Sequence, residues 1–419
     1  MRGALRSGRP LEAAADPHGF SAKRAARRYM KGILSRDFLA LILSVAVVGL
    51  GLGATIPLTA LALTQAGFGT GIVGLMTAMQ AGGGLAVAPF ASRVASRLGA
   101  RGTIVGAVIV AAFATIAMQF TVNLWLWAVL RFLCGAALML LFTIGEAWVT
   151  QLADDSTRGR VVAIYATNFT LFQMTGPVLV SAIGGWTSAR FAVCGAIFLL
   201  ALPALASIRG TPHTLASHDE HATAGDWRHV LPRMPALVIG TGFFALFDTL
   251  ALSLMPLFAI SHGVGADVGV LFASAILFGD TLMQFPIGWL ADRIGRTKVH
   301  VGAGVVVTLL LPLLPWAVEY PWLCWPLLFV TGAAAGSVYT LSIVACGERF
   351  RGTALVSATA IVGASWSVAS FGGPIIAGTL MDRVSPDALI GVLVVAAAAF
   401  LGAAAWEKRA STDDAERVS

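Results

Sequence analysis

Charged residues are scarce in this chain. Only 12% of its 419 residues are charged and its mean hydropathy is +0.83, whereas a soluble domain carries about 25% charged residues. The composition therefore excludes a water-exposed globular domain. The chain also lacks the alternating segments of a membrane β-barrel, and its apolar runs, each of about 20 residues, are long enough to cross a bilayer as helices. These features predict an all-helical, multi-pass membrane protein.

Motifs for enzyme chemistry are also missing. The four cysteines lie in or beside apolar runs without metal-ligand spacing, so we interpret them as packing residues. The sequence contains no phosphate-cradling Walker loop, no metal-ligand set and no nucleophile–base pair. No small-residue cleavage site follows the first apolar run, so we expect that run to be retained as a span. We expect neither an enzyme nor an ATP-driven pump, and no cofactor or metal.

Twelve apolar runs form two groups of six around a polar stretch with four histidines, which match no defined metal site. The predicted spans are 38–63, 70–91, 103–121, 123–149, 161–185, 190–208, 235–260, 267–290, 299–318, 322–346, 354–381 and 387–406. The predicted segments are a basic cytoplasmic N-terminal tail (1–36), a six-helix bundle (37–208), a cytoplasmic linker (209–234), a second six-helix bundle (235–406) and a cytoplasmic tail (407–419).

Basic residues lie almost entirely on one side of these spans. Of the 28 Lys and Arg residues, Arg131 lies within a span and only Arg190 and Arg383 fall on the opposite side. Because basic loops stay in the cytoplasm, both termini are predicted to be cytoplasmic. The net charge of +7 then reflects orientation and contact with anionic lipid rather than nucleic-acid binding.

Two unrelated landmarks recur at nearly the same interval. The stretch 288–296, which contains regularly placed glycines, has an incompletely preserved copy at 92–101, at an offset of 196 residues. A glycine–proline pair recurs at an offset of 197 residues. A duplicated membrane unit is the construction of many secondary transporters. The matched residues are Gly99 with Gly295, and Gly176-Pro177 with Gly373-Pro374.

The twelve spans, the duplication and the stretch 288–296 together resemble the major facilitator superfamily. The resemblance implies two pseudo-symmetric six-helix bundles that rock about a shared substrate site. It assigns the charged stretch to gating, and we hypothesise that Asp292 pairs with a basic residue such as Arg351 to favour the outward-facing state. In the first copy, Ser92 and Ser96 replace the family's Gly and Asp, so the second copy is the better candidate. The candidate gating residues are Gly288, Asp292, Arg293, Gly295, Arg296, Arg97, Gly99 and Arg351.

Other fragments extend the resemblance. Arg131 and Gly135 match the arginine-bearing motif of proton-coupled members, and Gly176-Pro177 is similar to the helix kink of antiporters. The stretch 145–148 is similar to a poorly characterised group of bacterial inner-membrane facilitators. The resemblance therefore implies a monomer in the bacterial inner membrane, but no particular substrate.

Four ionisable residues fall within spans, where each charge costs about 3 kcal/mol. Asp248 and Asp280 lie near the midplane, where a carboxyl group binds a proton when dehydrated and releases it when water arrives from one side. They are the candidates for proton coupling, in that order, unless a neighbouring helix neutralises them structurally. Arg131 is suited to hold an anionic substrate group or a permanent ion pair. Glu146 lies nearer the inner interface, which favours a gate or a loop contact.

Uncharged polar residues supply further candidates, because they bond a substrate without the desolvation cost of ions. Trp366 is suited to stack on a ring or cover a cation, and ordinary helix packing is the alternative for it. The candidates are Gln80, Asn168, Gln173, Gln284, Tyr339 and Trp366.

These residues predict a proton-driven secondary transporter of a small organic molecule. Export of a metabolite or drug-like compound is favoured, with cationic or amphipathic cargo. One alternative is a proton symporter that imports a nutrient or an organic anion held by Arg131. Another is a non-transporting membrane sensor or scaffold, although such a protein would tolerate loss of the charged stretch and of the midplane acids. The expected partners are the substrate, protons and membrane lipid.

Overall fold

The computed structural model describes residues 36–152, 158–183, 189–208 and 227–418, and within these ranges the chain is helical and forms no strand. The predicted N-terminal tail, except Arg36, and most of the predicted linker lie outside the described residues. The helices are α2 (Arg36–Gln65), α3 (Thr70–Val87), α4 (Ala91–Ala117), α5 (Leu124–Leu152), α6 (Arg158–Ile183), α7 (Arg190–Leu199), α8 (Ala201–Ser207), α9 (Trp227–Val230), α10 (Pro235–Ser253), α11 (Met255–Ser261), α12 (Ala266–Ile294), α13 (Arg296–Leu310), α14 (Leu314–Ala317), α15 (Pro321–Arg349), α16 (Gly352–Arg383) and α17 (Ala388–Val418), with short 3-10 turns at Ala88–Phe90, Met118–Phe120, Leu231–Arg233 and Leu311–Leu313.

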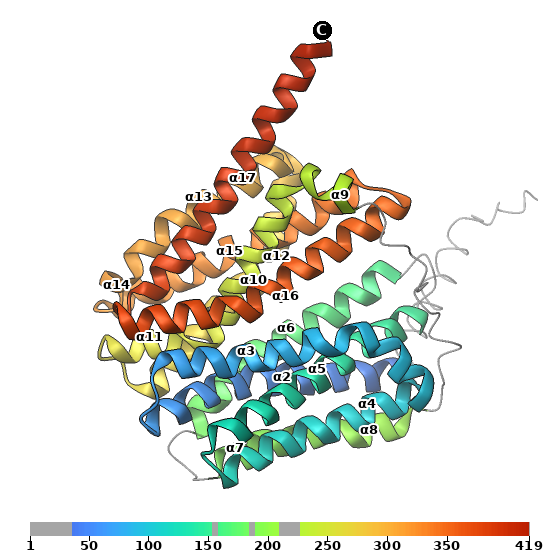
Figure 1. Cartoon of the computed structure of the whole chain (residues 1–419), viewed down its shortest axis with the longest axis vertical. Helices are drawn as coiled ribbons and strands as arrows, with labels where there is room; N and C mark the ends of the chain where they lie inside the picture. The colour runs from blue at the N-terminus through green and yellow to red at the C-terminus, as the bar shows by residue number, and fades with distance from the viewer. Residues whose placement is uncertain (1–35, 153–157, 184–188, 209–226, 419) are drawn as a thin grey trace, which may run out of the picture.

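These helices form two bundles, which we call the N half (α2–α8) and the C half (α10–α17). Figure 1 shows the N half in blue to green and the C half in yellow to red. Ten stretches among the described residues are long and apolar enough to span a membrane. One of them, Thr70–Phe120, contains both α3 and α4, and α6 lies outside the ten. Each of the twelve predicted spans therefore has a helical counterpart.

Three predicted spans are broken helices, and each break has a proline beside it. Pro203 follows the α7–α8 break, Pro256 follows the α10–α11 break, and Pro312 lies in the turn after α13. Proline lacks the N–H that continues a helix. At the chain's end the helix does not stop with the apolar run, because α17 continues to Val418 and projects beyond the bundle (Figure 1).

Contacts between helices repeat in the two halves at the same interval, 196–197 residues, as the sequence landmarks. A Cβ on Gly83 would lie 1.9 Å from the carbonyl oxygen of Phe132, and a Cβ on Gly279 would lie 1.9 Å from that of Phe329. Gly83 and Gly279 are 196 residues apart, and Phe132 and Phe329 are 197 apart. Each glycine therefore makes the same backbone-to-backbone contact in its half, α3 on α5 and α12 on α15, as close helix packing in membranes requires.

Each of the two charged stretches also contains a turn of the same backbone conformation. Gly99 and Gly295, the matched glycines, have φ values of 73° and 104°. This left-handed region is costly for residues with a Cβ, so glycine is the residue that makes the turn without strain. The predicted duplication is thus present in both helix packing and backbone conformation.

The halves meet along two seams, α3 against α16 and α6 against α12. We call the end of the bundle at residues 66–69 the far end, and the opposite end, where α2 begins, the near end. At the first seam a Cβ on Gly74 would lie 2.0 Å from the carbonyl oxygen of Pro374. At the second, the Ser274 hydroxyl donates to the carbonyl oxygen of Met174 (2.7 Å). All four residues lie in the far-end part of their helices.

Candidate functional site

Two predicted carboxylates come together inside the C half. Asp248 of α10 is half-buried and Asp280 of α12 is 5% exposed. Their charges interact. Within the described part of the chain Asp248 has no hydrogen-bond or ion-pair partner, and Asp280 accepts a hydrogen bond from Gln284 Nε2 (3.3 Å). Among these described residues, the pair therefore lacks a cationic partner.

A glycine makes room for Asp280. A Cβ on Gly336 of α15 would lie 1.6 Å from Asp280 Oδ1. No side chain can occupy that position while the carboxylate stays in place. The backbone of α15 therefore fixes where the acid lies.

Three aromatic rings from three helices lie beside these acids. Phe244, one turn before Asp248 on α10, stacks on Tyr339 of α15 with centroids 5.1 Å apart. Trp366 of α16 lies 5.2 Å from Tyr339 and 5.8 Å from Phe244. Tyr339 and Trp366 are both partly exposed. The arrangement offers aromatic faces next to negative charge.

Glu146 comes from α5 of the N half and is half-buried. Its position in the sequence favours a gate or loop contact at the inner interface. Glu146 has no ion-pair partner among the described residues, and its role at a gate stays a prediction.

The remaining predicted polar residues lie in helix packing of the N half. Arg131 is 1% exposed, and its Nε and Nη2 have no hydrogen-bond partner among the described residues. Gln80 is buried too, and its Oε1 has no partner in the same ranges. Asn168 donates to the carbonyl oxygen of Ile42 (2.8 Å), and Gln173 is 5% exposed. Each of these four residues is set apart from the acids of the C half.

The two kinks place glycine against a neighbouring helix in each half. A Cβ on Gly176 would lie 2.2 Å from the backbone of Gly53 in α2, and one on Gly373 would lie 2.0 Å from Leu246 Cδ1 in α10. Pro177 and Pro374 follow them inside α6 and α16. In each half the glycine before the proline therefore packs closely on a neighbouring helix, against backbone in α2 and against a side chain in α10.

An apolar cluster separates the acids from the far end. Ile56 of α2 packs with Leu252 of α10 and with Ala273 and Leu277 of α12. Leu252 lies one turn beyond Asp248 towards the far end, and Leu277 lies on the far-end side of Asp280. Both seams and this cluster close the far end in this conformation.

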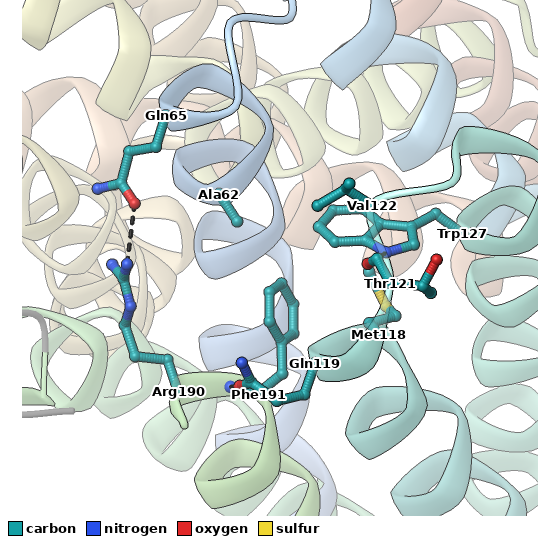
Figure 2. Close-up of a pocket in the computed structure, with 9 residues that line it drawn as sticks. All are labelled: Ala62, Gln65, Met118, Gln119, Thr121, Val122, Trp127, Arg190 and Phe191. Atoms are coloured by element: carbon teal, nitrogen blue, oxygen red, sulfur yellow. Dashed lines mark hydrogen bonds between the residues drawn. The ribbon is translucent and has the colours of Figure 1, made fainter. Parts of the chain in front are cut away.

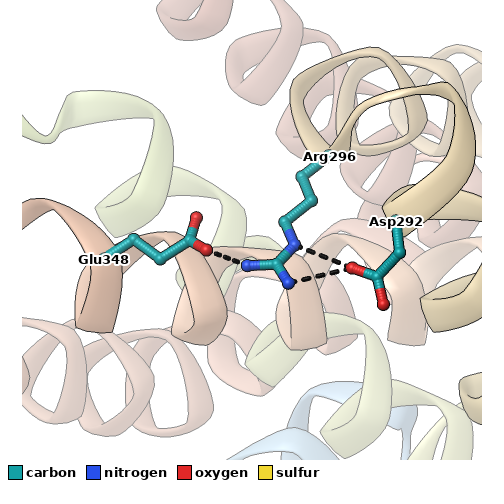
Figure 3. Close-up of polar contacts among 3 residues, drawn as sticks. All are labelled: Asp292, Arg296 and Glu348. Carbon is teal, nitrogen blue, oxygen red and sulfur yellow. Dashed lines mark hydrogen bonds and ion pairs between the residues drawn. The ribbon is translucent and has the colours of Figure 1, made fainter.

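The charged stretch at the near end is paired within its own half (Figure 3). Arg296 donates to Asp292 Oδ1 from Nε (3.1 Å) and from Nη2 (2.9 Å), and it also pairs with Glu348 of α15. In this conformation Asp292 pairs with Arg296, which lies four residues further along the chain, just past the left-handed turn at Gly295. Among the described residues Asp292 pairs with Arg296 and not with Arg351 in this conformation, and the pairing with Arg351 in the outward-facing state stays a prediction.

The other gating candidates are exposed at the same end. The guanidinium of Arg293 lies over the Trp289 ring, 3.8 Å from its centroid. Arg97, in the first copy of the charged stretch (residues 92–101), is exposed. A Cβ on Gly288 would meet nothing within 4 Å among the described residues, so packing does not demand glycine there.

A separate pocket opens at the far end of the N half. Figure 2 shows Arg190 pointing to Gln65, to whose Oε1 its Nη2 donates (2.9 Å), with Trp127 on the other side of the pocket. Its lining residues include none of the predicted site residues. The pocket lies among helices of one half and is not shared between halves.

Sequence reasoning missed three residues of these arrangements. Phe244 and Gly336 lie in apolar runs where phenylalanine and glycine are common, so nothing marked them. Asp382 lies just past a predicted span, and its carboxylate accepts hydrogen bonds from the start of α3. An acid at a span end gives no sign of a partner 312 residues away.

Two apolar helical bundles that repeat one packing plan, with two acids inside the spans of the C half, define a multi-pass membrane transporter fold. The Major Facilitator Superfamily model matches residues 41–280 and 237–417. The chain therefore belongs to the major facilitator superfamily, and it is a transporter, not an enzyme.

Known proteins agree with this assignment. The chain is 26% identical over 362 residues to "Uncharacterized MFS-type transporter YfkF" of Bacillus subtilis (strain 168), covering 82% of this chain and 88% of that protein. The structure is similar to that of the nucleoside transporter NupG, with a TM-score of 0.72, 13% identity and coverage of 90% and 99%. It is also similar to a D-xylose-proton symporter, with a TM-score of 0.68, 15% identity and coverage of 89% and 96%.

Proposed function

We propose that this protein is a proton-coupled antiporter that exports a small organic molecule, a metabolite or drug-like compound of cationic or amphipathic character. The observation that carries the proposal is the pair of carboxylates Asp248 and Asp280 inside the C half, one half-buried and one 5% exposed, which has no cationic partner among the described residues. Uncompensated charge in a membrane interior is costly, so these groups require either a proton or a cation. A proton and a cationic cargo that compete for the same carboxylates are coupled in opposite directions.

The orientation follows from the basic residues. Both termini are cytoplasmic in the inner membrane of a bacterium, and the far end faces outward. The conformation closed at the far end is then closed to the outside, and the proposed cycle requires a cytoplasm-open state in which cargo from the cell reaches the acids. The protein acts as a monomer in membrane lipid, the proton gradient supplies the energy, and no cofactor is needed.

Proteoliposomes containing the full chain, a trapped pH-sensitive dye and an imposed pH gradient test this function. Added cationic solutes should move protons in the opposite direction, and Asp248→Asn and Asp280→Asn should each reduce that movement at least about tenfold, since neither amide can carry the proton. Asp267→Asn, an exposed acid in the first turn of α12, is the matched control and should transport normally. Solute flux that ignores the gradient, or equal flux in the Asp248 and Asp267 variants, contradicts proton coupling.

A proton symporter for an organic anion is the second candidate, and one observation favours it. The buried Arg131 guanidinium has two nitrogens without acceptors among the described residues, which an anionic group would satisfy. The same liposomes separate the two functions, because a symporter moves protons in the direction of the solute. Absence of any solute-dependent flux would favour the sensor or scaffold instead.

A further inference from the structure

The start of α3 is capped by a residue from the other half. The N-cap residue Gly69 has no side chain to accept from the first-turn amides, which need partners from outside the helix. Asp382, at the end of α16, supplies them. Its Oδ1 accepts from Thr70 N (2.7 Å) and from the Thr70 hydroxyl (2.6 Å), and its Oδ2 accepts from Gly71 N (2.7 Å).

The local sequence leaves room for this carboxylate. A Cβ on Gly69 would lie 2.7 Å from Asp382 Oδ1, and one on Gly71 would lie 2.7 Å from Oδ2. One turn back along α16, a Cβ on Gly378 would lie 2.4 Å from the carbonyl oxygen of Thr70. Three glycines therefore allow the two helix ends to approach until the acid reaches the amides.

The equivalent positions of the other seam lack the residues for such a cap. By the 196–197 offset, Asp382 corresponds to Trp186 or Gly185, and neither carries an acid. Thr70 corresponds to Ala266, which has no hydroxyl. The contacts described for the α6–α12 seam are the Ser274–Met174 hydrogen bond and the apolar cluster. Residues 184–188 lie outside the described residues, so the comparison rests on the sequence, which carries no acid at either matched position of the other seam.

We propose that Asp382 is a latch that holds the far end shut. A carboxylate at a helix N-terminus is stabilised by the free amides and by the helix dipole. These bonds join the N half to the C half, so they break when α3 and α16 separate at the far end. Asp382 is exposed, and water can replace the lost bonds, which makes the latch weak and reversible. The inference goes beyond cargo and coupling, because it concerns only the balance between two conformations.

Spin labels on Ala66 and Val384 measure that balance in the full chain in nanodiscs. Both residues are exposed and flank the seam. Asp382→Asn should increase the population with a long Ala66–Val384 distance about fivefold. The effect is modest because charge-assisted hydrogen bonds at an exposed site contribute little to the stability of the closed state. Asp387→Asn is the control, because Asp387 pairs with His262 inside the C half, and it should leave the distances unchanged.

Thr70→Val supplies the second arm. If Thr70 and Asp382 bond directly, the effects of Thr70→Val and Asp382→Asn are less than additive in the double variant. Distances that do not change in Asp382→Asn overturn the latch, because that variant weakens the bonds to both backbone amides. Neither result depends on transport, so failure of the latch is distinguishable from failure of the proposed antiport.

Discussion

The N half and the C half share one packing plan but differ in chemistry. Gly83 and Gly279 make the same backbone contact 196 residues apart. At the next position, however, the N half has Gly84 where the C half has Asp280. The same interval places Asp248 opposite Gly51 or Leu52. Duplication therefore preserved the helix contacts, while this pair of acids and the capping acid Asp382 belong to the C half.

The largest effect should come from moving Asp280 without removing it. In Gly336→Ala the new Cβ would lie 1.6 Å from Asp280 Oδ1, so the carboxylate must shift, and we expect solute-driven proton movement to fall about tenfold or more. Gly347→Ala on the same helix is the matched control, because a Cβ there meets nothing within 4 Å among the described residues. Equal transport in the two variants would show that the C half tolerates a displaced acid.

A smaller effect should come from the aromatic rings of the C half. Binding of radiolabelled tetraphenylphosphonium to the purified chain in nanodiscs should weaken about fivefold in Trp366→Leu, through loss of a cation–π face. The affinity of Trp366→Phe should lie between those of the unchanged chain and Trp366→Leu. Trp316 is an exposed residue of α14, and Trp316→Leu should bind the cation normally. If the anion tetraphenylborate binds as tightly as the cation, the C half is not a cation site.

The smallest effect should come from the charged stretch. Asp292 and Arg296 are exposed by 64% and 42%, so their pair is worth about 0.5 kcal/mol. If Asp292 locks the outward-facing state, Asp292→Asn should shift the Ala66–Val384 distances towards the closed far end and slow transport about twofold. This shift is opposite in sign to that of Asp382→Asn. Unchanged transport and distances would remove the lock hypothesis.

The sequence predicted the fold because membrane burial imposes patterns that can be read locally. Long apolar runs and the repeated glycine-punctuated stretch each reflect a requirement of one segment. Asp248 and Asp280 were also found locally, since an acid within an apolar run stands out. Their proximity could not be read, because it depends on how α10 and α12 rotate against one another.

The residues that were missed owe their roles to distant partners. Gly336 matters because Asp280 lies against it, and Asp382 matters because the amides of α3 lie in front of it. Arg351 was expected to meet Asp292, but Arg296 is nearer along the same chain. Arg296 follows Asp292 by four residues across the turn at Gly295, so the chain itself brings these two side chains together.

The contacts of Gly83 and Gly279 have a mechanical consequence. Where backbone meets backbone, no rotatable side chain remains to absorb a displacement, so α3 with α5 and α12 with α15 behave as stiff pairs. A displacement at one end of such a helix pair is transmitted to the other end almost unchanged. Any movement between the halves is then accommodated at the seams rather than within these pairs, and a bulky residue at Gly74 would hold α3 away from α16.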